Sequence, residues 1–288
     1  MPEGDTVWLT ARRLHEALAG RVLTAADLRV PALATAGLAG RRVLDVTPRG
    51  KHLLTRLEGG ATLHSHLRMD GSWHVYAPGE RWRGGPQWQV RAVLATAERV
   101  AVGYRLPVLE LLPTSEEHTV VGHLGPDPLG PDWDPHEAVR RMLSQPDRAV
   151  GEALLDQRNL AGVGNVYKCE LCFLRGVSPW TPVGQVRAPD RMAALAARLL
   201  RANRERVGHV TTGDTRRGRT HWVYGRAGLP CLRCGTPVLR AGPGGGTGGV
   251  TGGVTGGPGG VTGGPPDVER VTYWCPRCQP GPAPAGNA

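Results

Sequence analysis

Phenylalanine and lysine are almost absent from this sequence. There is 1 Phe against 8 Trp and 5 Tyr, an unusual balance, although 40% of the residues are hydrophobic and can form a core. The only lysines are Lys51 and Lys168, and every other basic residue is arginine. Because an ammonium and a guanidinium differ in size, hydration and proton affinity, a lysine kept against this bias is informative. Lys51, in TPRGKHLL, is either an ordinary surface lysine or a residue that needs its ammonium.

Long apolar runs are missing as well, and so is a basic segment followed by an apolar leader. These absences argue against a membrane span and a secretion signal, and we expect a cytoplasmic bacterial protein. In that compartment the 6 cysteines are thiols or metal ligands rather than disulfides. Acidic residues are outnumbered, so the formal net charge is +10 and the pI is near 10.0, which indicates a polyanionic partner.

Local patterns divide the chain into a strand-rich part and a helical part. Val7, Leu14 and Leu18 lie at helical spacing and predict a helix over residues 6–19, with Gly20 as its C-cap. Short runs separated by glycine or proline then predict the strands of a mostly antiparallel arrangement, in residues 21–30, 41–50, 51–60, 61–76 and 91–104. HLGPDPLGPDWDP at 123–135 indicates a domain boundary, and residues 135–206 carry helical patterns.

Two C-x-x-C pairs near the C-terminus predict a structural zinc site. Four thiolates are the tetrahedral set that zinc prefers, and the candidate ligands are Cys231, Cys234, Cys275 and Cys278. The 40 residues between the pairs include a Gly-rich array at 241–266, predicted to be a flexible loop. Lengthening the loop from about 15 to 40 residues costs on the order of 1 kcal/mol, against roughly 10–16 kcal/mol from zinc binding. The insertion should therefore be tolerated.

Two further patterns concern the helical part. Cys169 and Cys172 also form a C-x-x-C, but they share one face of a predicted helix and we interpret them as buried core residues. In LLDQRNLAGVGNVY a helix is expected to end near Arg158 and a second to start at Asn165, after a glycine turn. Asn165 could cap that second helix, whose exposed N–H groups would suit a phosphate.

Taken together, the motifs resemble one known family over essentially the whole chain. MPEGD, RGKHLL, HSHLRMDGSW, LLDQRNLAGVGNVY and ERVTYWCPRCQ occur in this order. They resemble the formamidopyrimidine-DNA glycosylase/endonuclease VIII family of base-excision repair enzymes, and most of all its actinobacterial-type endonuclease VIII branch. The resemblance implies a bifunctional DNA glycosylase and abasic-site lyase that cleaves the strand by β,δ-elimination.

The resemblance implies three catalytic residues, and Pro2 is the nucleophile among them. Removal of Met1 would leave Pro2 with a free secondary amine that forms an iminium with the sugar. With a pKa of about 8, roughly a quarter of an α-amino group is neutral at pH 7.5, against about 0.1% of a lysine. Glu3 corresponds to the family carboxyl that protonates the sugar-ring oxygen and shuttles protons. Lys51 corresponds to the lysine that contacts the lesion-flanking phosphate.

Three DNA-binding residues follow from the same resemblance. Asn165 and Arg270 correspond to the phosphate-binding residues of the helix–two-turn–helix and of the zinc hairpin's tip. Met69 falls where the family inserts a side chain into the gap left by a flipped-out base, and the alternative is a core filler. His64 and His66 flank Ser65, and packing or DNA contact is favoured over a metal site.

Two departures from the family pattern bear on activity. Thr6 stands where other members commonly carry Glu, which puts a second carboxylate role there in doubt. The Arg-x-Phe wedge of the formamidopyrimidine branch is not evident around VGYRLPVLELL, which favours oxidised pyrimidines over oxidised purines as substrates. The contacts of residues 211–228 cannot be assigned from the sequence.

We therefore expect an α+β fold. An N-terminal β-sandwich flanked by helices (1–128) precedes a helix–two-turn–helix domain (129–222), a zinc-binding β-hairpin (223–280) and a disordered tail (281–288). The expected partner is double-stranded DNA with oxidised bases or abasic sites, bound by a monomer that holds one structural zinc ion. The alternatives are a non-catalytic damaged-DNA-binding zinc protein, an oxidised-purine glycosylase of the same family, and a metal-dependent nuclease that uses His64 and His66.

Overall fold

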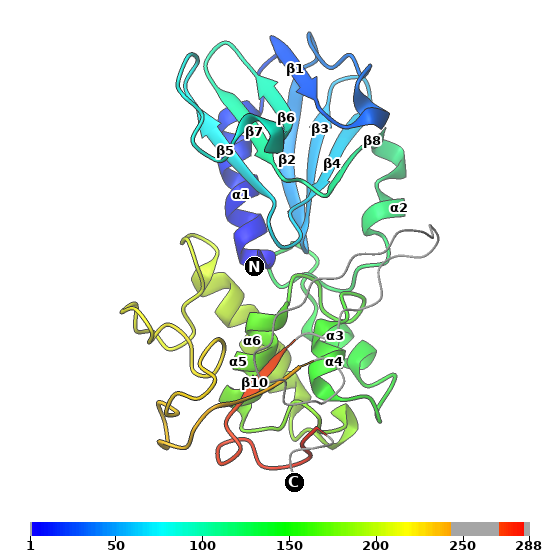
Figure 1. Ribbon diagram of the computed structural model, residues 1–288. Coiled ribbons are helices and arrows are strands. Elements are labelled where there is room, and N and C mark those ends of the chain that lie inside the picture. Colours follow the sequence, from blue (N-terminus) through cyan, green and yellow to red (C-terminus); the bar gives the residue numbers. More distant parts are fainter. Residues whose placement is uncertain (1, 243–270, 285–288) are drawn as a thin grey trace, which may run out of the picture. The chain divides into compact units, whose positions relative to one another are not determined.

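The computed structural model describes residues 2–242 and 271–284 (Figure 1). It forms two compact units, each built from separate stretches of the chain. The first unit comprises the described residues of Met1–Arg141, Asp156–Val163 and Ala196–Gly208. The second unit comprises the described residues of Met142–Leu155, Gly164–Leu195 and His209–Ala288. The domain boundaries expected from the sequence stay a prediction.

Two four-stranded antiparallel sheets make up most of the first unit. One sheet has the order β2-β3-β4-β8, from β2 (Val43–Arg49), β3 (His52–Leu57), β4 (Ala61–His66) and β8 (Val108–Pro113). The other has the order β1-β6-β7-β5, from β1 (Ala25–Leu28), β6 (Val90–Ala95), β7 (Val100–Tyr104) and β5 (Ser72–Tyr76). The expected α+β fold with an N-terminal β-sandwich is confirmed.

A single apolar core joins helix α1 (Gly4–Leu18) to both sheets. Val7, Ala11, Leu14 and Leu18 follow one another at intervals of three or four residues, so they form one buried stripe along the helix. Leu53 and Leu57 of β3 point to the same side of their strand and join this stripe in the core. The helix starts two residues earlier than predicted, because the Val7 N–H already bonds to the Glu3 carbonyl, 3.0 Å away.

Strand β8 was not among the predicted strands. The run VLELLP lacks a clear alternation of apolar and polar residues and ends on Pro113. Its hydrophobic pattern therefore favours neither the strand period nor the helical period. In the structure it pairs with β4 as an edge strand, where a terminal proline costs no ladder hydrogen bond. The segment is therefore a strand because it pairs with β4 in the folded protein, and its local sequence does not predict this.

The described residues beyond β8 form further α-helices. They are α2 (His118–Val121), α3 (Pro135–Met142), α4 (Val150–Leu155), α5 (Asn165–Arg175) and α6 (Pro189–Asn203), of which α6 is as long as α1. The predicted start at Asn165 is correct, but α4 ends at Leu155 and not near Arg158. The N-cap of α5 is Gly164, without a side-chain cap, so the expected capping role of Asn165 is wrong.

Helix α5 and a small hairpin form the core of the second unit. Strand β9 (Leu239–Ala241) pairs antiparallel with β10 (Thr272–Trp274). Phe173, the only phenylalanine of the sequence, is fully buried and stacks on Trp222 with a centroid distance of 5.4 Å. The Arg233 guanidinium lies 4.3 Å from the centre of the Phe173 ring. In both described stretches, no helix is long and apolar enough to cross a bilayer.

Candidate active site and nucleic-acid interface

The N-terminus of the first unit is anchored rather than loose. Pro2 is half-buried and Glu3 is fully buried at the N-cap of α1. The Gly4 N–H donates to the Gly162 carbonyl at 2.9 Å, and a Cβ on Gly4 would lie 3.0 Å from the Gly162 Cα. A side chain on Gly4 would push the two backbones apart by a few tenths of an ångström, so glycine favours this close approach. The residues after Met1 are therefore docked on the loop that contains Gly162.

Lys51 forms a hydrogen bond with the same loop. Gly50 has a φ of +57°, which closes the turn between β2 and β3, and its N–H donates to Asp127 Oδ2 at 2.7 Å. Lys51 is the next residue and is 9% exposed, and its Nζ donates to the Val163 carbonyl at 2.6 Å. The interpretation of Lys51 as an ordinary surface lysine is wrong.

The side-chain amide of Gln157 forms hydrogen bonds with the backbone of residues 162 and 163. Its Nε2 donates to the Val163 carbonyl at 2.8 Å, and its Oε1 accepts from the Gly162 N–H at 3.0 Å. Gly162 itself has a φ of +87°, the left-handed region that favours glycine. Gly4, which directly follows Pro2 and Glu3, and Lys51 thus bond to one short segment, residues 161–163, although they are far apart in the sequence.

The sequence analysis missed two residues of this arrangement. Gln157 lies just before the glycine turn and Asp127 within GPDP, and neither has a spacing that singles it out. Burial raises the pKa of Asp127, while the N–H groups of Gly50 and Leu129 counteract the rise. Thr6 is half-buried, whereas its neighbour Asp5 is a buried carboxylate.

The turn between β4 and β5 presents Met69. Arg68 has a φ of +49°, and the Gly71 N–H closes the turn on the Leu67 carbonyl at 2.8 Å. A Cβ on Gly71 would lie 2.5 Å from that carbonyl oxygen, so the turn requires glycine there. Met69 is 61% exposed. The alternative that Met69 fills the core is therefore wrong.

Four histidines meet beside this turn. His52 Nδ1 lies 2.9 Å from His64 Nε2, and His64 Nδ1 lies 3.2 Å from Glu110 Oε2. His66 and His123 contact the His52 ring edge-on, with centroid distances of 4.9 and 6.2 Å. Burial, reinforced by His66 and His64, lowers the pKa of His52 to about 2. His64 is 3% exposed, which agrees with packing, while the expectation of packing or DNA contact for His64 and His66 stays a prediction.

In the second unit, the start of α5 holds the start of β10. Asn165 Nδ2 donates to the Val271 carbonyl at 2.9 Å, and Lys168 Nζ donates to Thr272 Oγ1 at 2.6 Å. Among the described residues, the buried Asn165 Oδ1 has no hydrogen-bond partner. Arg270 and residues 243–266 of the Gly-rich insertion lie outside the described residues.

Glu170 on α5 anchors the segment 211–224, whose contacts the sequence did not reveal. Its carboxylate accepts the backbone N–H groups of Trp222, Val223 and Tyr224 at 2.8, 2.9 and 2.9 Å. The Thr211 hydroxyl donates to the same carboxylate. A fully buried carboxylate is stabilised by such a cluster of donors, so Glu170 fixes both ends of this segment on the helix.

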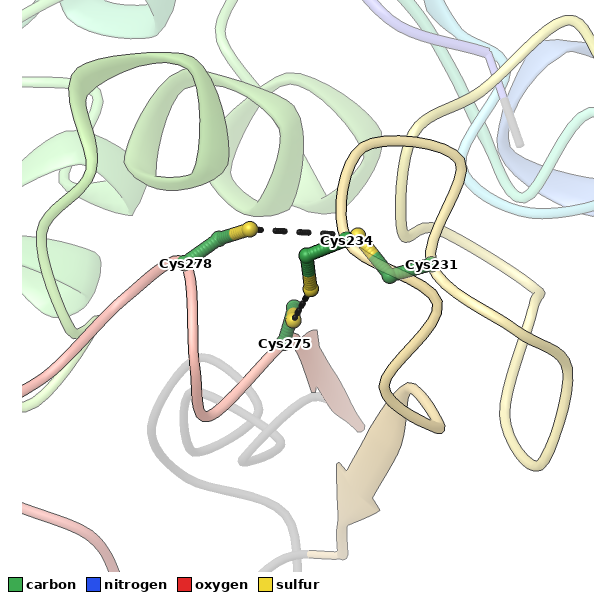
Figure 2. Close-up of side chains that lie close together, drawn as sticks. All are labelled: Cys231, Cys234, Cys275 and Cys278. Atoms are coloured by element: carbon green, nitrogen blue, oxygen red, sulfur yellow. Dashed lines mark hydrogen bonds between the residues drawn. The ribbon is translucent and has the colours of Figure 1, made fainter.

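The four C-terminal cysteines converge on one point (Figure 2). Their sulfur atoms all lie within 4.8 Å of one another, and the Cys234–Cys275 and Cys231–Cys278 distances are 3.5 and 4.0 Å. A tetrahedral zinc with bonds of about 2.3 Å would place its sulfurs about 3.8 Å apart. The four thiols therefore fit a metal ion of this size. They are the only such group of three or more ligands in the described parts of the chain, and His64 and His66 form none.

The other C-x-x-C pair is different. Cys169 and Cys172 are fully buried in α5, and burial raises the pKa of the Cys172 thiol to about 12. A protonated thiol in an apolar core is neither a nucleophile nor a metal ligand. The interpretation of this pair as core residues is confirmed.

Two family profiles match the chain. The formamidopyrimidine-DNA glycosylase N-terminal domain matches residues 1–105, and the formamidopyrimidine-DNA glycosylase H2TH domain matches residues 124–209. The first match contains the terminus, Lys51 and the Met69 turn. The second contains Gln157, the glycine turn and α5.

Similar proteins span nearly the same length. "Probable endonuclease 8 2" of Streptomyces coelicolor is 62% identical over 99% of this chain and 96% of its own. "DNA-(apurinic or apyrimidinic site) lyase Nei2" of Mycolicibacterium smegmatis is 46% identical over 97% and 99%. A crystal structure of the Lactococcus lactis formamidopyrimidine-DNA glycosylase, with DNA that contains an abasic site, has a TM-score of 0.74 at 19% identity. It covers 97% of this chain and 100% of that one, and supports the fold.

Proposed function

This chain belongs to the formamidopyrimidine-DNA glycosylase/endonuclease VIII family, and we propose on that basis that it is a bifunctional DNA glycosylase and abasic-site lyase of base-excision repair. One feature of the structure supports this proposal independently of the relatives. The N–H of Gly4, two residues after Pro2, and the ammonium of Lys51 both donate hydrogen bonds to residues 161–163, at 2.9 and 2.6 Å. This brings together a nucleophile, an acid and a cation.

Pro2 is the proposed nucleophile once Met1 has been removed. Its neutral secondary amine attacks C1′ of the deoxyribose, the damaged base leaves with a proton, and an iminium forms as the sugar ring opens. Loss of the C2′ proton expels the 3′ phosphate, and loss of the C4′ proton then expels the 5′ phosphate. Water finally hydrolyses the iminium and restores the amine.

Glu3 and Lys51 support these steps. The Glu3 carboxyl is next to Pro2 and protonates the ring oxygen O4′, which promotes ring opening. Lys51 places a positive charge beside the same segment and binds the phosphate that flanks the lesion. Asp127 and Gln157 position these groups by holding Gly50 and the 161–163 segment, and do not touch the substrate.

The remaining predicted residues have proposed roles in DNA binding or in metal binding. Met69, exposed on a turn that glycine and Arg68 hold in shape, enters the space left by the flipped-out base. Asn165 and Arg270 bind phosphates. The four cysteines hold one zinc ion, which supplies structural stability to the hairpin and no chemistry in the reaction.

Oxidised pyrimidines are the proposed substrates, with oxidised purines as the alternative. The segment that would carry the purine branch's wedge consists of Arg105, Leu106 and Pro107, between the end of β7 and the start of β8. Arg105 Nε there donates to the Asp70 carbonyl at 3.0 Å, so it supports the Met69 turn instead. We expect the protein to act as a cytoplasmic monomer on double-stranded DNA.

Borohydride trapping tests the chemistry. A duplex with one abasic site is incubated with the protein and sodium borohydride, and the adduct is mapped by mass spectrometry. The expected result is one covalent adduct on Pro2, formed equally well in EDTA. Pro2→Leu, whose bulky second residue retains Met1, should give none, whereas the matched control Thr6→Ser should still be trapped.

Other outcomes identify the alternatives. Binding to damaged duplex without any adduct would support the non-catalytic zinc protein. Strand cleavage that stops in EDTA, again without an adduct, would support the metal-dependent nuclease. A panel of duplexes with single oxidised pyrimidines or purines then decides the substrate class from the rate of strand cleavage.

A further inference from the structure

A groove of about 510 Å³ lies between α1 and the edge strand β5 in the first unit. Its α1 wall includes Arg13 and Leu14, and its β5 wall includes Trp73 and Tyr76. Arg99, at the turn before β7, completes the rim. In Figure 1, α1 and β5 lie at one side of the sandwich. The groove is thus formed by a helix and a strand that has a neighbour on only one side.

The backbone of β5 is unpaired along this groove. In the sheet order β1-β6-β7-β5, only β7 pairs with β5, in a continuous register from Ser72 to Tyr76. Within the described stretches, no backbone hydrogen bond outside this ladder reaches these five residues. Alternate N–H and C=O groups of an edge strand point away from the sheet and can pair with an added strand.

The groove is lined by two arginines, Arg13 and Arg99, and by one carboxylate, Glu16, so the charge at its rim is net positive. Arg12 pairs with Glu16 and Arg21 with Glu98, but Arg13 and Arg99 have no ion-pair partner among the described residues. Burial, and then the nearby Arg105 and Arg13, lowers the pKa of His74, so that ring is neutral at pH 7. Two guanidinium groups are therefore available to an anionic partner.

We propose that the α1–β5 groove binds an extended acidic segment of a partner protein, which adds to β5 as a further strand. Main-chain hydrogen bonds to β5 supply affinity, while alternating side chains face the groove walls or the rim. Carboxylates of the segment pair with Arg13 and Arg99, and its apolar residues contact Trp73 and Val75. The occupant is a peptide rather than a small anion because the strand edge offers a row of backbone groups.

The groove is separate from the proposed reaction centre. Arg13 follows Glu3 by ten residues along α1, which corresponds to about 15 Å of helix. A bound segment therefore leaves incision of naked duplex DNA unchanged. The surface would serve to bring the protein to other proteins, and it goes beyond the proposed repair chemistry.

A peptide selection with the full chain tests the proposal. Phage that display random nine-residue peptides are selected on the purified protein, and Kd values of the enriched peptides are measured by fluorescence polarisation. We expect acidic peptides whose affinity falls at least tenfold in the double variant Arg13→Glu/Arg99→Glu. The matched control Arg81→Glu/Arg191→Glu makes the same charge change at two exposed arginines outside the groove, and should alter Kd less than twofold.

Two readouts on the wild-type protein remain informative if the double variant folds poorly. N-methylation of alternate peptide amides should abolish binding in one register and not in the other. Hydrogen exchange should show protection of residues 72–76 when the peptide is added. The proposal fails if selection yields no peptide that depends on the groove, if the enriched peptides are neutral or basic, or if protection appears elsewhere. Competition by inorganic phosphate alone would indicate a small-anion site and also overturn it.

Discussion

Both lysines of this arginine-rich chain are buried, and each directs its ammonium to an oxygen atom. Lys51 is 9% exposed and bonds to the Val163 carbonyl, and Lys168 is 2% exposed and bonds to Thr272 Oγ1. A compact ammonium fits such a site, whereas a planar guanidinium is larger and directs its donors along fixed axes. The scarcity of lysine is thus informative at these two positions.

Lys51→Arg should keep the charge and lose the activity. The guanidinium cannot occupy the position of Nζ without displacing residues 161–163, on which the N-terminus is docked. Displacement of about 1 Å at a reaction centre costs on the order of 100-fold in rate. We expect incision of abasic duplex to fall by about that factor, with an unchanged circular dichroism spectrum.

The control for this change is the exposed arginine Arg81, replaced by lysine. Arg81→Lys should incise DNA at the wild-type rate. Wild-type incision by Lys51→Arg would show that the ammonium has no special role and would contradict the arrangement proposed here.

His52 makes the first unit sensitive to acid. Its pKa is about 2 in the folded protein and about 6.5 in an unfolded chain. Because the folded state binds the proton less tightly, the stability from neutral His52 is complete above pH 6.5 and is lost as pH falls below it. The free energy of unfolding should decrease by about 2 kcal/mol between pH 6.5 and pH 5.0 from this group.

Urea unfolding at pH 7.5 and pH 5.0 measures this effect. The variant His52→Gln keeps a polar side chain without titration and should lose most of the difference between the two pH values. His136→Gln, at an exposed histidine on α3, should keep it. Equal pH dependence in wild type and His52→Gln would refute the assignment.

At the level of elements, one helix organises the second unit. Helix α5 holds β10 through Asn165 and Lys168, and holds the segment 211–224 through Glu170. The segment contains no strand or helix of its own, so the Glu170 carboxylate and the packing of Trp222 and Val223 hold it in place.

Glu170→Gln should loosen residues 211–224 selectively. The amide group of glutamine would face backbone donors that need an acceptor, and charged hydrogen bonds would be lost. The expected cost is about 2–4 kcal/mol. Exchange of the Trp222, Val223 and Tyr224 amides should become at least about 30-fold faster, as measured by hydrogen exchange. Glu152→Gln, in an exposed pair with Arg148, should leave these rates unchanged.

For the whole molecule, the division into two units separates the proposed chemistry from the proposed metal. Residues 2–4, 49–51 and 157–163 belong to the first unit, whereas the four cysteines belong to the second. Loss of zinc should therefore act through the fold of the second unit and through DNA binding.

Replacement of one zinc ligand tests this division. Cys275→Ser should lower the zinc content from about one ion per chain to near zero, since structural sites need all four ligands. Duplex affinity should fall, while the urea unfolding of the first unit stays the same. Cys172→Ser, at the buried core thiol, should retain zinc. Full zinc content in Cys275→Ser would exclude these ligands.

The sequence by itself determined what depends on local spacing. Helical periodicity located α1, short runs between glycines located seven of the strands in the sandwich, and paired C-x-x-C turns located the cysteine cluster. Lys51 was noticed because it breaks a strong arginine bias. These signals can be read from the sequence alone because periodicity and ligand spacing are properties of residues that are close together in the chain.

Tertiary structure alone decided the contacts between distant residues. Asp127 meets Gly50 across 77 positions, Gln157 holds a loop that receives Lys51 across 112, and Glu170 meets Trp222 across 52. The exposure of Met69 and the pairing of β8 also required the fold. No local pattern encodes such contacts, because they depend on which segments the packed core brings together.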